Sequence, residues 1–184
     1  MRLNLSLILS LLLISGLGGC KKEEGTEGAP SGGGTAGPSG GGEEAAKALL
    51  EPFLKPGADL AALSRPLLPT KADCETVFVP DAAAKAAGAY SAAIASGRVV
   101  IRPNPGQTQL LLFSATTDDF KQKTPKASEF PDGYARIADK LKPGLTVYRW
   151  KFVEPGKTLG MAYDGLYFIN GKWTWFPKPW LFVR

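Results

Sequence analysis

Most of the aromatic side chains of this chain lie near its C-terminus, and this concentration constrains the fold more than any other feature. Eleven of the 18 aromatic residues, including all four tryptophans, lie between Tyr148 and Phe182. Aromatic residues favour strands, where they pack on a pleated and half-buried surface. The sequence therefore predicts a C-terminal β-sheet with an apolar face that other elements must cover.

One turn in this region can be assigned in detail. Asn170-Gly171 separates two strand-like segments, 166–169 and 172–176. Both central residues of a type I′ turn need positive φ, which Asn and Gly tolerate. The two-residue turn also fixes the register, because residues at equal distances from it oppose one another. The face predicted to be apolar holds Leu166, Phe168, Trp173 and Trp175.

The segments before the sheet have helical patterns. Apolar residues spaced for one helical face occur first, at Ala46, Leu49, Leu50, Phe53 and Leu54. Thr70 with Asp73 three residues later has the pattern of a capping box, and an alanine-rich helix is expected from a cap at Asp81 to about Ser96. Segments 99–101 and 110–113 are short apolar strand candidates. The predicted fold class is α+β, in two layers, with N-terminal helices packed on one face of a C-terminal antiparallel β-meander.

The composition excludes several kinds of catalytic site. The chain has no histidine and two cysteines. Ser-His-Asp and Cys-His catalysis and imidazole-ligated zinc all need a histidine. Cys74 is then a poor nucleophile and is expected to be buried. With no phosphate loop, metal-ligand cluster or dinucleotide motif in the sequence, we expect no catalytic residue, no cofactor and no metal.

The N-terminus has the pattern of an export signal. Residues 5–17 are apolar apart from serines and one glycine, and the run is too short to span a bilayer. It ends in Leu17-Gly18-Gly19-Cys20, which resembles the lipobox of bacterial lipoproteins. The resemblance covers residues 1–20 only.

The resemblance implies that residues 1–19 are a signal peptide removed before Cys20. It also implies that Cys20 is acylated, with palmitate among the expected chains, and that this membrane lipid anchors the protein. Lys21 after the cysteine implies the outer membrane, with the protein facing the periplasm. Residues 20–42 then form the lipidated cysteine and a tether, and residues 43–184 form the globular domain.

The tether has the composition of a flexible linker. Residues 21–42 contain nine glycines and no apolar side chain larger than proline. A Gly-rich coil of this length has an end-to-end distance of about 26 Å. We therefore expect a domain that can move relative to its anchor.

Two functions fit these observations. The first is a non-enzymatic binding module for an envelope protein or a small ligand, with Trp180 and Tyr163 as candidate contacts. The aromatic sheet could bind a ligand, but core packing is the stronger interpretation of most of it. The chain carries a formal charge of +5, and Lys121, Lys123 and Lys126 form its densest basic cluster. A solvated loop explains that cluster better than a binding site, and no nucleic-acid partner is expected in an exported protein.

The alternative function is a carboxylate-based hydrolase that acts on envelope glycans. Such an enzyme needs two acids about 5–9.5 Å apart across a cleft. The candidates are Asp118, Asp119, Asp132 and Asp164. Convergence of these acids would favour the hydrolase, and their separation would favour the binding module.

Overall fold

The computed structural model describes residues 40–183. Cys20 and the signal segment lie outside the described residues, as does most of the tether. The described residues belong to one compact unit, Thr35–Arg184. Helices come first along this unit and a four-stranded antiparallel sheet follows, which confirms the predicted α+β class.

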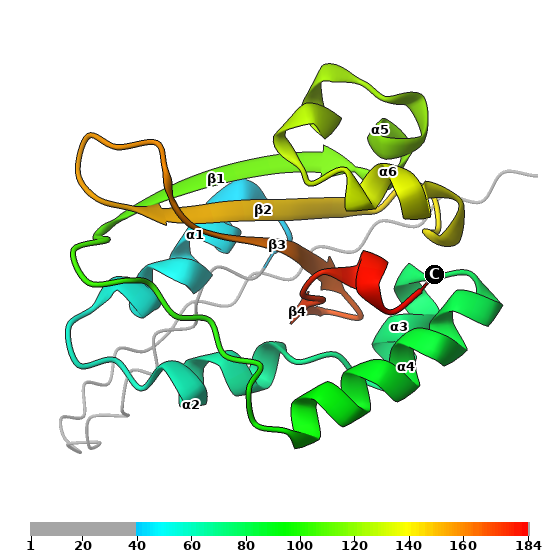
Figure 1. The fold of residues 1–184 in the computed structure, drawn as a ribbon, viewed down its shortest axis with the longest axis horizontal. Coiled ribbons are helices and arrows are strands. Elements are labelled where there is room, and N and C mark those ends of the chain that lie inside the picture. Colours follow the sequence, from blue (N-terminus) through cyan, green and yellow to red (C-terminus); the bar gives the residue numbers. More distant parts are fainter. Residues whose placement is uncertain (1–39, 184) are drawn as a thin grey trace, which may run out of the picture. The chain divides into compact units, whose positions relative to one another are not determined.

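Four helices precede the sheet (Figure 1). They are α1 (Glu43–Leu50), α2 (Leu60–Ser64), α3 (Lys71–Val77) and α4 (Pro80–Ala95), with the 3₁₀ turns η1 (Glu51–Leu54) and η2 (Arg65–Leu67) after the first two. Thr70 and Asp73 form the predicted capping box at the start of α3. The prediction of an Asp81 cap for α4 is wrong, because the helix already begins at Pro80, whose fixed φ suits the first helical position.

The sheet is a meander in the order β1-β2-β3-β4. Its strands are β1 (Gln109–Thr116), β2 (Thr146–Val153), β3 (Gly160–Ile169) and β4 (Lys172–Trp175). Between β1 and β2 lie α5 (Thr117–Gln122), η3 (Pro125–Glu129), α6 (Gly133–Ile137) and η4 (Ala138–Lys140), and η5 (Pro179–Leu181) follows β4.

The hairpin at Asn170-Gly171 forms as predicted. Its two central residues have φ of 52° and 73°. Phe168 faces Trp173 and Leu166 faces Trp175 across the strands, so the register derived from the turn is confirmed.

Segment 99–101 is not a strand in the structure. It runs beside the helices, and the Ile101 N–H donates to the Ser64 hydroxyl at 2.9 Å. Burial of the Ile101 side chain, which is 0% exposed, explains the apolar run without sheet pairing. The apolar run correctly predicted burial at Ile101, but the prediction that this segment is a strand was wrong.

Helices cover both faces of the sheet, so the expected two-layer arrangement is also wrong. One face packs against α1, η1, α2 and η2, and it contributes Tyr148, Trp150, Phe152, Leu166 and Trp175. The other face packs against α3, α4, α5 and α6, and it contributes Ala115, Val147, Tyr167 and Ile169. In Figure 1, α3 and α4 lie side by side, close to the C-terminal end of the described chain.

A β-bulge interrupts the pairing of β2 with β3. Tyr148 opposes Leu166 but Arg149 opposes Asp164, which leaves Gly165 as the extra residue. Gly165 has φ of +85°, and its carbonyl accepts a hydrogen bond from the Phe176 N–H at 2.7 Å. A Cβ atom at this position would clash with the Phe176 carbonyl oxygen. The bulge therefore requires glycine for its conformation and for the close approach of the chain after β4.

This requirement predicts a large cost for Gly165→Ala. Gly156→Ala is the matched control, since Gly156 has φ of +73° but open space around it. The control should lose about 1–2 kcal/mol from the positive φ alone. Gly165→Ala should lose about 1–3 kcal/mol more, because the clash adds overpacking strain. Urea unfolding of residues 35–184 measures both, and equal losses would show that the close approach does not matter.

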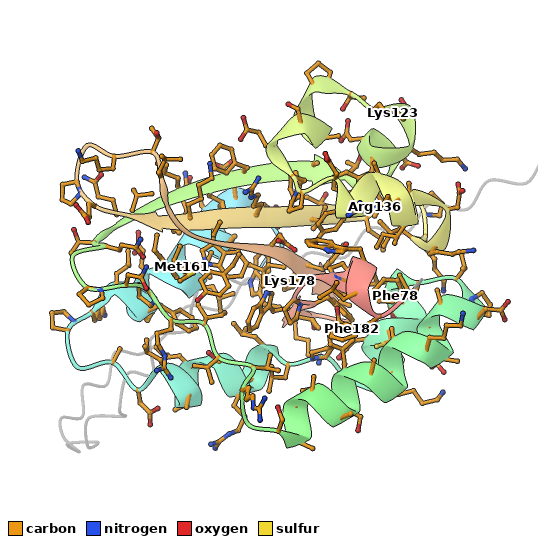
Figure 2. The ribbon with its side chains drawn as sticks, viewed as in Figure 1. Phe78, Lys123, Arg136, Met161, Lys178 and Phe182 are labelled. Atoms are coloured by element: carbon orange, nitrogen blue, oxygen red, sulfur yellow. The ribbon has the colours of Figure 1, made fainter. Side chains whose placement is uncertain are left out.

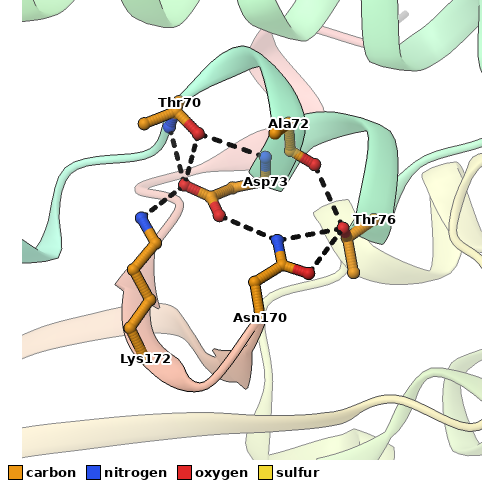
Figure 3. Close-up of polar contacts among 6 residues, drawn as sticks. All are labelled: Thr70, Ala72, Asp73, Thr76, Asn170 and Lys172. Carbon is orange, nitrogen blue, oxygen red and sulfur yellow. Dashed lines mark hydrogen bonds and ion pairs between the residues drawn. The ribbon is translucent and has the colours of Figure 1, made fainter.

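Asp73 joins the hairpin to α3 (Figure 3). Its side chain is 1% exposed. One oxygen accepts from the Lys172 ammonium at 2.6 Å and from the Thr70 hydroxyl at 2.7 Å and N–H at 2.9 Å. The other oxygen accepts from the Asn170 amide at 3.0 Å. Burial alone would raise the pKa of Asp73, but these hydrogen bonds, led by the one from Lys172, lower it below its ordinary value.

Candidate functional site

The described structure contains an apolar groove of about 710 Å³. It lies among α1, α2, η2 and the tip of the β3–β4 hairpin. Six of the side chains that line it are Ala48, Leu49, Ala62, Leu63, Phe168 and Trp173. The small side chains of α1 and α2 leave this space unfilled. Its volume is within the range of about 300–1,000 Å³ for small-molecule sites.

The described chain begins at the rim of this groove. Gly40 lines the groove, and Gly41 is fixed against the sheet. The Tyr148 hydroxyl donates to the Gly41 carbonyl at 2.7 Å. The Phe168 ring packs so closely that a Cβ atom on Gly41 would lie 2.7 Å from it. These two contacts hold the start of the domain beside the groove.

A second cavity, of about 310 Å³, lies beside the bulge. Its lining combines charged, aromatic and aliphatic residues, among them Arg98, Met161, Tyr163, Asp164, Trp175 and Lys178. Figure 2 labels two of them, Met161 near the start of β3 and Lys178 in the segment after β4. Residues 98–100, the sheet and the chain after β4 therefore form this cavity together.

Asp164 is the buried acid of the second cavity and is 8% exposed. Its carboxylate accepts a hydrogen bond from the Tyr134 hydroxyl at 3.1 Å. Burial raises the pKa of Asp164 to about 6, although hydrogen bonds from the Tyr134 hydroxyl and the Lys178 N–H and the charges of Arg149 and Lys178 oppose the rise. Among the described residues no lysine or arginine forms an ion pair with it.

The raised pKa of Asp164 predicts a pH dependence of stability. The folded protein binds this proton more tightly than the unfolded chain, so the free energy of unfolding should fall as the pH rises from about 4 to about 6. The fall should be about 2–3 kcal/mol for a shift of this size. Asp164→Asn keeps an acceptor for Tyr134 and should remove the fall.

The measurement is urea unfolding of residues 35–184 at several pH values for wild type and variant. Their difference isolates Asp164 from carboxyls such as Asp73 and Asp119, whose lowered pKa values act at lower pH and in the opposite direction. Asp132→Asn, which changes an exposed carboxyl just before α6, is the control and should follow the wild type. Parallel curves for Asp164→Asn and wild type would contradict the shift.

The structure places Trp180 and Tyr163 in different surroundings. Trp180 is half-buried, with its ring against Gly133 and 5.3 Å from the Tyr134 ring. The Tyr163 hydroxyl donates to the Arg102 carbonyl at 2.9 Å and accepts from the Arg102 N–H at 2.8 Å. Neither residue lines the apolar groove, although Tyr163 lines the second cavity.

The four candidate acids of the hydrolase have separate surroundings. Asp118 accepts from the Gly144 N–H at 2.7 Å, and Asp119 belongs to the capping box of α5 with Thr116 and accepts from the Thr124 hydroxyl at 2.6 Å. Asp132 is exposed at the start of α6, and Asp164 is buried against Tyr134. No hydrogen bond recorded between described residues joins any two of these four acids.

The remaining thiol of the domain is buried, as expected. Cys74 is 0% exposed, and burial raises its pKa to about 11. A thiol with this pKa holds little thiolate at neutral pH and reacts slowly. Within residues 40–183 no cluster of three or more acidic or cysteine side chains is placed to hold a metal ion.

Comparison of the chain with protein-family models, curated proteins and solved structures finds no match. In residues 40–183 the structure contains no helix with the length and apolar character needed to cross a bilayer. The two hollows and the N-terminal motif are therefore the features of this protein that bear on its function.

Neither the apolar groove nor the second cavity could be predicted from the sequence. The groove combines α1 and α2 with a hairpin more than 100 residues later. Its one local signal in the sequence is the alanine at positions 45, 48 and 62, where a small side chain leaves the helix surface uncovered. The second cavity depends on the bulge, and Asp164-Gly165 is a weak local signal for that bulge.

Proposed function

We propose that this protein is a lipid-anchored lipoprotein of the bacterial cell envelope whose domain is a non-enzymatic binding module. The lipobox-like motif that ends at Cys20 supports the anchor. On this proposal the acylated cysteine holds the protein at the outer membrane, facing the periplasm. Each buried methylene of an acyl chain contributes about 0.8 kcal/mol, so two or three chains give a stable anchor.

The apolar groove is the observation that supports a binding function. Its walls are mainly alanine, leucine, proline and aromatic side chains, and Lys172 at its edge is held by Asp73. An apolar hollow of about 710 Å³ suits a chain of methylenes better than a polar or charged ligand. A protein anchored in lipid works at a surface of acyl chains. We therefore assign the groove to one acyl chain of a membrane lipid.

The anchor predicts where the protein is found after one substitution. Cys20→Ala in the full-length chain removes the acylation site and should move the protein from the membrane fraction to the soluble fraction. Cys74→Ala, which changes the buried cysteine, is the matched control and should stay in the membrane fraction. The intact mass of the wild-type protein should match a chain that begins at Cys20 and carries acyl groups. Retention of the Cys20 variant in the membrane, or an unmodified mass, would contradict the anchor.

The groove predicts binding of a free acyl chain. Palmitate titrated into residues 35–184 should change the tryptophan fluorescence, since Trp173 lines the groove. Ala62→Phe places a ring in the groove and should weaken binding at least about tenfold, because excluding two methylenes removes about 1.6 kcal/mol.

Ala61→Phe is the matched control for this experiment. Ala61 is the exposed neighbour on α2 and does not line the groove. Its palmitate affinity should stay within about twofold of wild type, a change of about 0.4 kcal/mol. Equal binding by both variants would place palmitate elsewhere, and no binding by wild type would overturn the assignment to an acyl chain.

A further inference from the structure

The second cavity holds a buried acid that forms no ion pair among the described residues. Asp164 lines this cavity and is 8% exposed. Its pKa of about 6 leaves the carboxyl mostly ionised at pH 7. A carboxylate this deeply buried is rare in proteins unless a cation or several donors neutralise it.

The protein supplies only part of that neutralisation. The Tyr134 hydroxyl donates one hydrogen bond at 3.1 Å, the Lys178 N–H donates another, and the Lys178 charge also favours the ionised carboxylate. Arg149 opposes Asp164 across the two strands and acts on it electrostatically, but the two form no ion pair and Arg149 does not line the cavity. Asp73 shows the contrast, since the Lys172 ammonium lies 2.6 Å from its carboxylate. Asp164 therefore accepts hydrogen bonds but forms no ion pair among the described residues, whereas Asp73 has both.

The other walls of the cavity have two kinds of chemistry. Tyr163 and Trp175 are aromatic, with ring centroids 5.7 Å apart, and aromatic faces attract ammonium groups. Arg98 and Lys178 line the same cavity and are exposed to solvent, so they can meet an anion at its mouth. Lys178 has φ of 48°, a left-handed conformation that is uncommon for a residue other than glycine. Such conformations cluster at binding sites.

We propose that this cavity binds a small zwitterion with the size and charges of an amino acid. The ammonium group lies against the Asp164 carboxylate and the aromatic walls. The carboxylate lies against Arg98 and Lys178 at the mouth. A volume of about 310 Å³ is at the lower end of the range for small-molecule sites, which fits a ligand of this size.

Three related probes test the proposal on residues 35–184, which contain both apolar cores of the described structure. They are L-leucine, leucinamide, which lacks the carboxylate, and N-acetyl-leucine, which lacks the ammonium group. Calorimetric titration at pH 7 should show that L-leucine binds most tightly and leucinamide at least about tenfold more weakly, which is the loss of about 1.4 kcal/mol. N-acetyl-leucine should give no saturable heat. Equal binding by all three probes, or no binding by L-leucine, would overturn the proposal.

Three variants assign the roles within the cavity. Asp164→Asn should weaken L-leucine binding at least about tenfold while the protein stays folded at pH 7, since asparagine still accepts from Tyr134. Arg98→Gln should weaken the binding of L-leucine but leave the binding of leucinamide unchanged, because leucinamide has no carboxylate. Asp132→Asn, outside the cavity, is the control and should bind like wild type. Loss of L-leucine binding in Asp132→Asn, or L-leucine binding by Asp164→Asn as tight as that of wild type, would contradict the assignment.

The same variants separate this proposal from the acyl-chain groove. Asp164→Asn should leave palmitate binding unchanged, and Ala62→Phe should leave L-leucine binding unchanged. Failure of palmitate to bind therefore says nothing against the zwitterion site, and the reverse also holds.

Discussion

The hydrogen bonds that converge on the Asp73 carboxylate connect the helical half of the domain to its sheet. Thr70 and Asp73 define the start of α3, and the same carboxylate accepts from Asn170 and Lys172 at the hairpin. The turn is held at a fixed position against α3, and so are β3 and β4. The groove lies on one side of this hairpin and the α3–α4 core on the other. Both depend on this connection for their shape.

Two buried acids, Asp73 and Asp164, have pKa values that are shifted in opposite directions by their neighbours. Asp73 and Asp164 are both almost fully buried. Hydrogen bonds and a cation outweigh burial at Asp73 and lower its pKa, whereas burial prevails at Asp164 and raises its pKa to about 6. A buried carboxylate with an ion pair stabilises a fold, while one without an ion pair has interaction energy left for a ligand. This contrast is why we assign a structural role to the first and a binding role to the second.

Features that depend on residues close in the chain could be predicted from the sequence, whereas features that depend on distant residues could not. The Asn170-Gly171 register and the Thr70 capping box follow from local backbone geometry, so both could be predicted. Alternation along the strands identified one apolar face, but burial of Tyr167 and Ile169 on the other comes from helices far away in the chain. The two hollows are spaces left between such elements. Periodicity within a segment carries no information about them, and for the same reason Tyr163 could be singled out without its cavity.

The geometry at the start of the described chain links the groove to the proposed anchor. The Tyr148 hydrogen bond and the Phe168 ring fix Gly41, and Gly40 lines the groove itself. Glycine at position 41 is required by this contact, whereas the glycines before it in the sequence fit a linker. A point of attachment fixed in this way determines which surface of the domain adjoins the tether, whatever the conformation of the tether. That surface is the apolar one, which is where a site for acyl chains is useful on a protein anchored by lipid. The charged cavity beside the bulge uses different elements, so the two proposed ligands would not compete.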